Sequence, residues 1–163
     1  MTSEQMQHLI GEIIARLHVR TGQTATLSVG ALRTASITSL CCTYDRLHIC
    51  QADLIFLQHL ARGENTDAAV QHLYEALAFG VAVDLSLHST LLACLPVKKL
   101  AHLPLSLRDE HGIPVYLHPA AVLSYRDVSG HSTGWLVTAR QTVITALARE
   151  RAQYQHLQLL EQE

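Results

Sequence analysis

Apolar side chains recur at helical spacing near the start of the chain. Positions three and four apart fall on one side of an α-helix, and this pattern predicts a helix over residues 4–19. The apolar stripe consists of Met6, Leu9, Ile10, Ile13, Ile14 and Leu17. Thr2, followed three residues later by Gln5, has the pattern of a capping box. The sequence therefore predicts a capped amphipathic helix.

A short polar segment separates this helix from the rest of the chain. Gly22 ends the helical pattern, and residues 21–26 contain only threonine, glycine, glutamine and alanine. We therefore expect an N-terminal helix over residues 1–20, a polar tether over 21–26 and a single α/β domain over 27–163. A lone helix of this length is marginally stable in water, so its stripe needs a surface to cover it. That surface belongs either to the same chain or to a partner, and the tether favours a detachable docking element.

Strand and helix patterns alternate from residue 27 onwards. Residues 40–43 and 47–50 have the composition of short strands on either side of a turn. Asp53 is suited to cap a helix that runs to residue 61 and ends at Gly63. A second helix starts at residue 65 or 66 and stops at Gly80. Its expected buried face consists of Val70, Leu73, Leu77 and Ala78.

The second half of the chain is richer in strands. A strand over residues 81–87 and a short helix over 90–95 precede two strands, 105–107 and 113–117, that flank a hairpin turn at 109–112. A strand over 135–139, a helix over 143–154 and a closing strand over 157–160 follow. These elements predict an α/β fold with a mixed, mostly parallel sheet and flanking helices. A degenerate flavodoxin-like arrangement is one form of this class.

Composition and charge narrow the possible partners. The formal net charge is −2 and the longest run of basic residues is Lys98-Lys99, so no positive field would attract nucleic acid. No apolar stretch approaches the 18 or so residues of a membrane span, and the N-terminus lacks the pattern of a signal peptide. We therefore expect a cytoplasmic protein that binds neither nucleic acid nor membrane. The four cysteines are expected to be small core residues of a reduced protein.

Catalytic and cofactor patterns are weak. Asp84, Ser86 and His88 have the residue types of a hydrolase triad, but alternate residues of one strand lie about 6.5 to 7 Å apart, too far for hydrogen bonds. Asp109 and Glu110 fall in the predicted hairpin turn, where both carboxylates are expected to be solvated. The eleven histidines are scattered, and no glycine-rich loop has phosphate-binding spacing. The sequence therefore predicts a protein that is not an enzyme and binds no metal or cofactor.

Four segments closely resemble the PduM family of propanediol-utilization microcompartment proteins. They are LSLHSTLLACLPVKKLAHLPL at residues 85–105, DEHGIPVYLH at 109–118, VLSYRDV at 122–128 and VITALARE at 143–150. The likeness extends over nearly the whole chain. It implies a non-catalytic structural component, needed for assembly of the bacterial microcompartment that degrades 1,2-propanediol, with shell proteins or encapsulated enzymes as partners. The helix at residues 4–19 also resembles the tethered helices that guide cargo to microcompartment shells.

A weaker resemblance points to an alternative function. The order of elements over residues 47–89 is similar to the central part of flavin-dependent cysteine decarboxylase-like proteins, which implies a flavodoxin-like protein that binds a flavin or nucleotide. The first turn that would hold the flavin phosphate is missing, and Asp53 stands where that family has Asn. Because an anion at this position would repel a phosphate, the resemblance implies that flavin binding has been lost.

Overall fold

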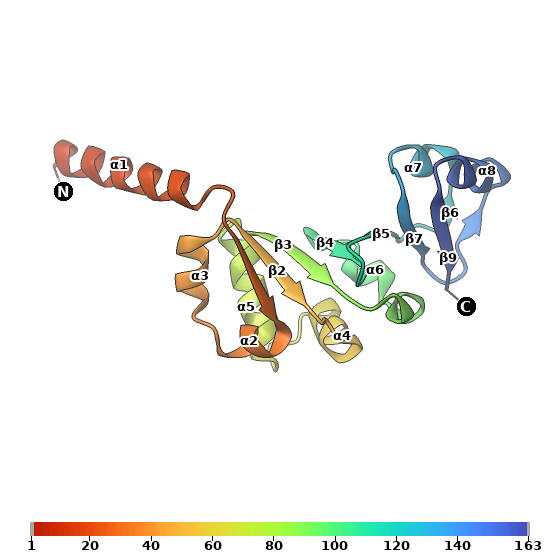
Figure 1. The fold of residues 1–163 in the computed structure, drawn as a ribbon, viewed down its shortest axis with the longest axis horizontal. Coiled ribbons are helices and arrows are strands. Elements are labelled where there is room, and N and C mark those ends of the chain that lie inside the picture. The colour runs from red at the N-terminus through yellow and green to blue at the C-terminus, as the bar shows by residue number, and fades with distance from the viewer. Residues whose placement is uncertain (1, 163) are drawn as a thin grey trace.

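The computed structural model describes residues 2–162, which form an elongated molecule built on a seven-stranded sheet. Helix α1 (Ser3–Arg20) projects from one end of this sheet, and the two helices α7 (Tyr125–Ser129) and α8 (Ala146–Tyr154) lie at the other end (Figure 1). The strands follow the order β1-β2-β3-β4-β5-β7-β9. This order contains no reversal, the feature at which flavodoxin-like sheets bind their ligands.

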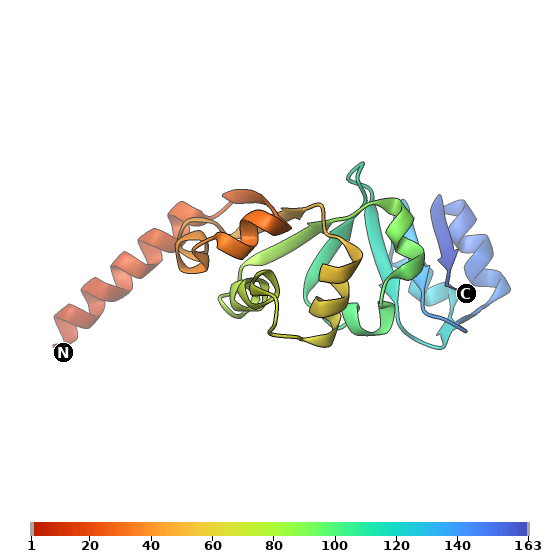
Figure 2. The ribbon, with the colours of Figure 1, turned by 90° about the horizontal axis from the view of Figure 1, so that it is seen from below.

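The first four strands are parallel and share one layer of helices. They are β1 (Thr24–Ser28), β2 (Arg46–Cys50), β3 (Ala82–Ser86) and β4 (Leu105–Arg108). Their connections contain α2 (Val29–Thr34), α3 (Ile37–Thr43), α4 (Leu54–Arg62), α5 (Ala68–Ala78), the 3₁₀ helix η1 (Ser89–Cys94) and α6 (Val97–Leu100). Right-handed crossovers that always step in the same direction place these helices on the same face of the sheet, as Figure 2 shows.

The chain reverses direction at the hairpin between β4 and β5 (Pro114–His118), which pair antiparallel. Strands β5, β7 (Gly134–Thr138) and β9 (Leu157–Glu161) are then parallel to one another. Because these strands run the other way, right-handed crossovers now place α7 and α8 on the opposite face. Two short strands, β6 (Val122–Leu123) and β8 (Val143–Ile144), form a separate parallel pair in this second lobe.

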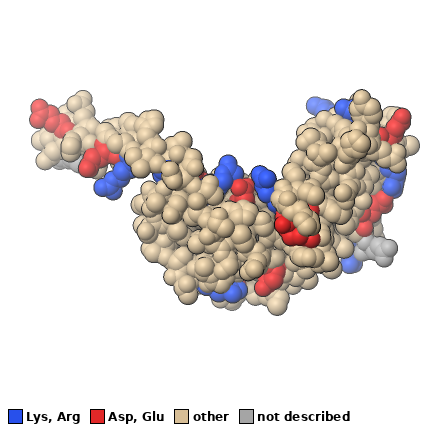
Figure 3. Space-filling model, viewed as in Figure 1, with Lys and Arg blue, Asp and Glu red and all other residues tan. Residues whose placement is uncertain are grey.

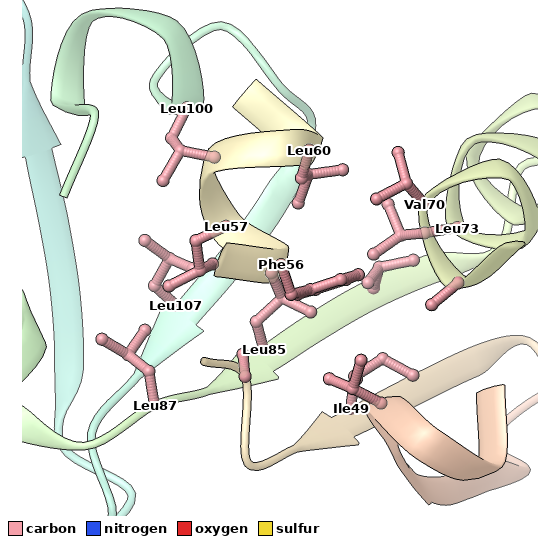
Figure 4. Close-up of a cluster of buried hydrophobic side chains, with 14 of the residues drawn as sticks. Ile49, Phe56, Leu57, Leu60, Val70, Leu73, Leu85, Leu87, Leu100 and Leu107 are labelled. Carbon is pink, nitrogen blue, oxygen red and sulfur yellow. The ribbon is translucent and has the colours of Figure 1, made fainter. Parts of the chain in front are cut away.

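The sheet therefore separates two hydrophobic cores. The larger core lies under the first layer of helices and includes Phe56, Leu57 and Leu85, all fully buried (Figure 4). The smaller core lies under α7 and α8. Adjacent residues of β7 serve different cores, Val137 the larger and Leu136 the smaller, as the alternation of side chains along a strand requires. The predicted class, an α/β fold with a mostly parallel sheet preceded by a helix, is confirmed.

Local capping explains why several elements begin and end where the sequence predicts. The Asp53 carboxylate accepts a hydrogen bond of 2.7 Å from the backbone N–H of Phe56 and starts α4. Gly63 ends the same helix with a positive φ of 66°, a conformation that glycine adopts without strain. The predicted hairpin and closing strand are also present.

Other boundaries differ from the predictions. Residues 40–43, expected as a strand, belong to α3, because Ile37 and Cys41 pack on the core one helical turn apart. Residues 143–144 form β8, and the helix expected from 143 begins only after Thr145 caps it. The second helix begins at Ala68 rather than 65 or 66, and Ala78 on its expected buried face is exposed. The polar segment 21–26 is shorter in the structure, since Thr24 already begins β1.

The cysteines do not all occupy the core as expected. Cys41 is buried and Cys50 is half-buried, but Cys42 and Cys94 are exposed. All four thiols are free. Cys42 follows Cys41 on α3 and so points about 100° away from the buried face of that helix.

Candidate docking surface

Helix α1 begins with the predicted capping box. The Thr2 hydroxyl accepts a hydrogen bond from the backbone N–H of Gln5, and the Gln5 side chain accepts one from the backbone N–H of Thr2. Glu4 in the first turn and Arg20 in the last have the signs that the helix dipole favours. These features stabilise a helix that receives little support from the body.

The predicted apolar stripe lies open along this helix. Each of its six side chains is 45–49% exposed, and no described residue of α1 is buried. The stripe consists of Met6, Leu9, Ile10, Ile13, Ile14 and Leu17. Full burial of such side chains contributes about 1.5 to 3 kcal/mol each, so covering the exposed half of all six would contribute about 6 kcal/mol before the entropic cost of binding. A surface of this kind is typical of helices that dock into a groove.

The last turn of α1 is held by a few polar contacts. Arg20 donates a hydrogen bond of 2.6 Å to the carbonyl oxygen of Cys41, which anchors the helix to α3. The N–H of Gly22 donates to the Asp45 carboxylate at 2.6 Å. The carbonyl of Gln23 accepts bonds from the backbone N–H groups of Asp45 and of Arg46, the first residue of β2. These contacts set the direction of the helix without covering its stripe.

A groove continues the stripe onto the body. Ile13 and Leu17 of α1 line a pocket of about 190 Å³ together with residues of α3 and Phe79, the residue that follows α5. Phe79 is itself exposed. Sequence reasoning missed Phe79, because a single aromatic residue at the end of a helix gives no signal without its neighbours in space.

The residues considered for hydrolase chemistry do not assemble into a site. The Asp84 carboxylate is buried and accepts a 2.8 Å bond from Arg46. Ser86 lies 3.1 Å from the His48 Nε2 atom, and His88 bonds within its own turn to Thr90. Each of these three residues thus has a different partner, as expected from their spacing along one strand.

The two carboxylates of the hairpin turn are structural, and the expectation that both are solvated is wrong. Asp109 is buried and accepts bonds from the backbone N–H groups of His111 and Ile113 and from Trp135 Nε1 at 3.0 Å. Glu110 accepts two bonds from Ser89. Hydrogen bonds from its own backbone N–H and from the Ser89 hydroxyl lower the pKa of Glu110 to about 2. A carboxylate held ionised in this way is a poor general acid.

The described residues form neither a metal-binding cluster nor a membrane-spanning helix. Within residues 2–162, no three His, Cys, Asp or Glu side chains gather closely enough to hold a metal ion. His48 and Cys50, the pair with the nearest to ligand spacing, lie on the same face of β2 without a third ligand. In the same part of the chain, no helix has the length and apolar character needed to cross a bilayer.

Comparisons with known proteins identify close relatives. The family model PDU_like, described as "Putative propanediol utilisation", matches residues 8–158. A protein named "Bacterial microcompartment assembly protein PduM" from Salmonella typhimurium is 49% identical over 163 residues, the whole of both chains. A protein of the same name from Citrobacter freundii is 44% identical, again over the whole of both chains. No solved structure matches the chain.

Proposed function

This chain belongs to the PduM family of microcompartment assembly proteins, and from that premise we propose that it helps to assemble the bacterial microcompartment for 1,2-propanediol utilisation. We propose that it works without catalysing a reaction, by binding shell proteins or encapsulated enzymes inside the microcompartment. The names of both relatives describe an assembly role, and their full-length similarity supports the same role here.

The exposed stripe of α1 is the structural observation that supports this proposal. Six apolar side chains on a projecting helix would be costly to leave in water, and a partner groove would cover them. The contacts of Arg20 and Gly22 hold the base of the helix, so its outer turns are presented to a partner. The pocket beside Phe79 would extend the contact onto the body.

Recruitment of a fluorescent protein tests the docking role of α1. Residues 1–20 fused to a fluorescent protein should concentrate in the microcompartments of bacteria that form them. The Ile10→Glu, Ile13→Glu double substitution places two charges within the stripe and should leave the fluorescence diffuse. A matched control, His8→Glu with Ala15→Glu, adds two acidic residues to the opposite face of the same helix and should still be recruited.

Two results would contradict the docking role. One is diffuse fluorescence from the unmodified fusion. The other is equal recruitment of the stripe variant and the control, because the apolar stripe would then contribute nothing. Introducing the same pairs of substitutions into the full-length chain and counting intact microcompartments extends the test to assembly.

A further inference from the structure

Helix α8 has an exposed face that the fold does not use. Its buried face consists of Ala148 and Ala152, whose small side chains bring the helix close to the sheet. The opposite face presents Leu147, Glu150, Arg151 and Tyr154, which lie three and four residues apart and so form one stripe. Leu147 is 63% exposed and Tyr154 is 77% exposed. With Tyr125 of α7, these residues line a surface pocket of about 410 Å³.

The arginine of this face is held in position by two aromatic rings. The guanidinium carbon of Arg151 lies 5.6 Å from the centre of the Tyr125 ring and 5.4 Å from that of Tyr154. Contact with two aromatic rings restricts the side chain and leaves the outer nitrogens of the guanidinium as donors. Among residues 2–162, neither Arg151 nor Glu150 forms an ion pair. Arg151 itself is half-buried, and an arginine held between tyrosines is typical of the centre of a protein interface.

The order of residues along this face is self-complementary. Leu147 and Tyr154 are equally distant from the midpoint between Glu150 and Arg151. A second α8 helix running antiparallel across that midpoint would therefore place Glu150 opposite the other copy's Arg151, and Leu147 opposite the other copy's Tyr154. A two-fold axis makes each of these contacts twice.

We propose that this chain forms a two-fold symmetric dimer through the exposed face of α8 together with Tyr125. A second copy satisfies both charges of the face at once. An acidic partner would be repelled by Glu150 and a basic partner by Arg151, whereas the antiparallel copy presents the two signs in reverse order. The apolar ends of the stripe and the tyrosine rings supply the buried area.

The proposed dimer leaves α1 free and does not depend on its docking role. The α8 face and α1 lie at opposite ends of the molecule (Figure 1). A dimer would therefore carry two separate α1 helices, and each could bind a different partner molecule. Two linked binding sites raise the overall affinity for a surface that repeats the partner groove, a property suited to an assembly protein.

Charge reversal in the full-length chain tests the proposal. Sedimentation velocity over a series of protein concentrations should show a monomer–dimer equilibrium for the unmodified protein. Glu150→Arg and Arg151→Glu each place two like-charged pairs at the two-fold axis and should weaken dimerisation by about tenfold or more. Mixing the two single variants should restore dimers, because each chain then meets its opposite charges. The double variant with both substitutions should also dimerise.

A control variant and a second surface keep the test specific. Arg140→Glu makes the same change in net charge as Arg151→Glu, but at an exposed arginine outside the α8 face, and should dimerise like the unmodified protein. The Ile10→Glu, Ile13→Glu variant of α1 should also dimerise normally. A protein that stays monomeric at every concentration would overturn the proposal. So would dimers that survive both single reversals, single variants that remain monomeric when mixed, or dimers lost with the control or the α1 variant. Circular dichroism of each variant verifies that it is folded.

Discussion

Deleting residues 2–19 should leave the rest of the protein folded and nearly as stable as the full chain. The deletion removes the apolar stripe but keeps Arg20, whose guanidinium binds the Cys41 carbonyl, and Gly22, which binds Asp45. The body would therefore keep the hydrogen bonds that Arg20 and Gly22 make at the base of the helix. If α1 instead belonged to the core, the same deletion would expose a large apolar area.

The expected loss follows from how little of α1 touches the body. Only Ile13 and Leu17 of the stripe line the groove against α3 and Phe79, and both side chains are still nearly half exposed. At about 25 cal/mol per Å² of apolar area, two such partial contacts contribute about 1 kcal/mol. Leu32→Ala provides a scale, because Leu32 is fully buried and its truncation should cost about 2 to 5 kcal/mol.

Urea denaturation followed by circular dichroism measures both changes in the free energy of unfolding. The free energy of unfolding of the deletion variant should lie within about 1 kcal/mol of that of the full chain. The free energy of unfolding of Leu32→Ala should be clearly lower than both. A deletion that costs as much as Leu32→Ala, or that abolishes cooperative unfolding, would refute the reasoning. Such a result would mean that the helix packs on its own domain and offers no free surface for a partner.

Two further predictions concern single contacts in the body. Ser89→Ala removes the hydroxyl hydrogen bond that lowers the pKa of Glu110 and leaves the bond from the backbone N–H of residue 89, so it should destabilise the protein above pH 4.5, the ordinary pKa of glutamate. The difference from the unmodified chain should disappear as the pH falls towards about 2, and a difference that persists at low pH would contradict this. Gly134→Ala should cost about 1 to 3 kcal/mol in urea denaturation, because its Cβ would lie 2.7 Å from the Pro114 carbonyl oxygen, whereas Gly130→Ala, with open space around it, should cost little.

Elements whose signals are local could be predicted from the sequence. The α1 stripe repeats over several turns, and Thr2 and Gln5 are close enough in the chain to form their capping box without other help. The same holds for α4, which has Asp53 at one end and Gly63 at the other. In both helices the spacing of apolar residues and the capping residues indicate the same boundaries. These helices could therefore be predicted without knowing how the rest of the chain packs.

The errors fall where distant parts of the chain decide the structure. Residues 40–43 are too few to show a period, and their helical state depends on Cys41 packing in the larger core. Asp109 was expected in water because turns are usually solvated. The side chain that helps to bury it, Trp135, lies 26 residues further along the chain. No local sequence pattern predicts a contact between residues so far apart in the chain.

The candidate surfaces were predictable to different degrees. The residues of the α1 stripe followed from their spacing, whereas the arrangement around Arg151 needed the structure. A single helix predicted over residues 143–154 does not show that α8 starts at Ala146 and turns Leu147 and Tyr154 outwards. Tyr125, which completes that face, comes from another helix.

The unequal size of the two cores has a consequence for how the molecule opens. Leu123, Val128 and four other buried residues hold the smaller core together, on the opposite face of the sheet from the larger one. Thermal fluctuations should therefore detach α8 and β9 well before the strands beside α4 separate. Amide hydrogen exchange would record this order as rapid labelling of the last twenty residues or so, and any partner that clamps α8 would slow it.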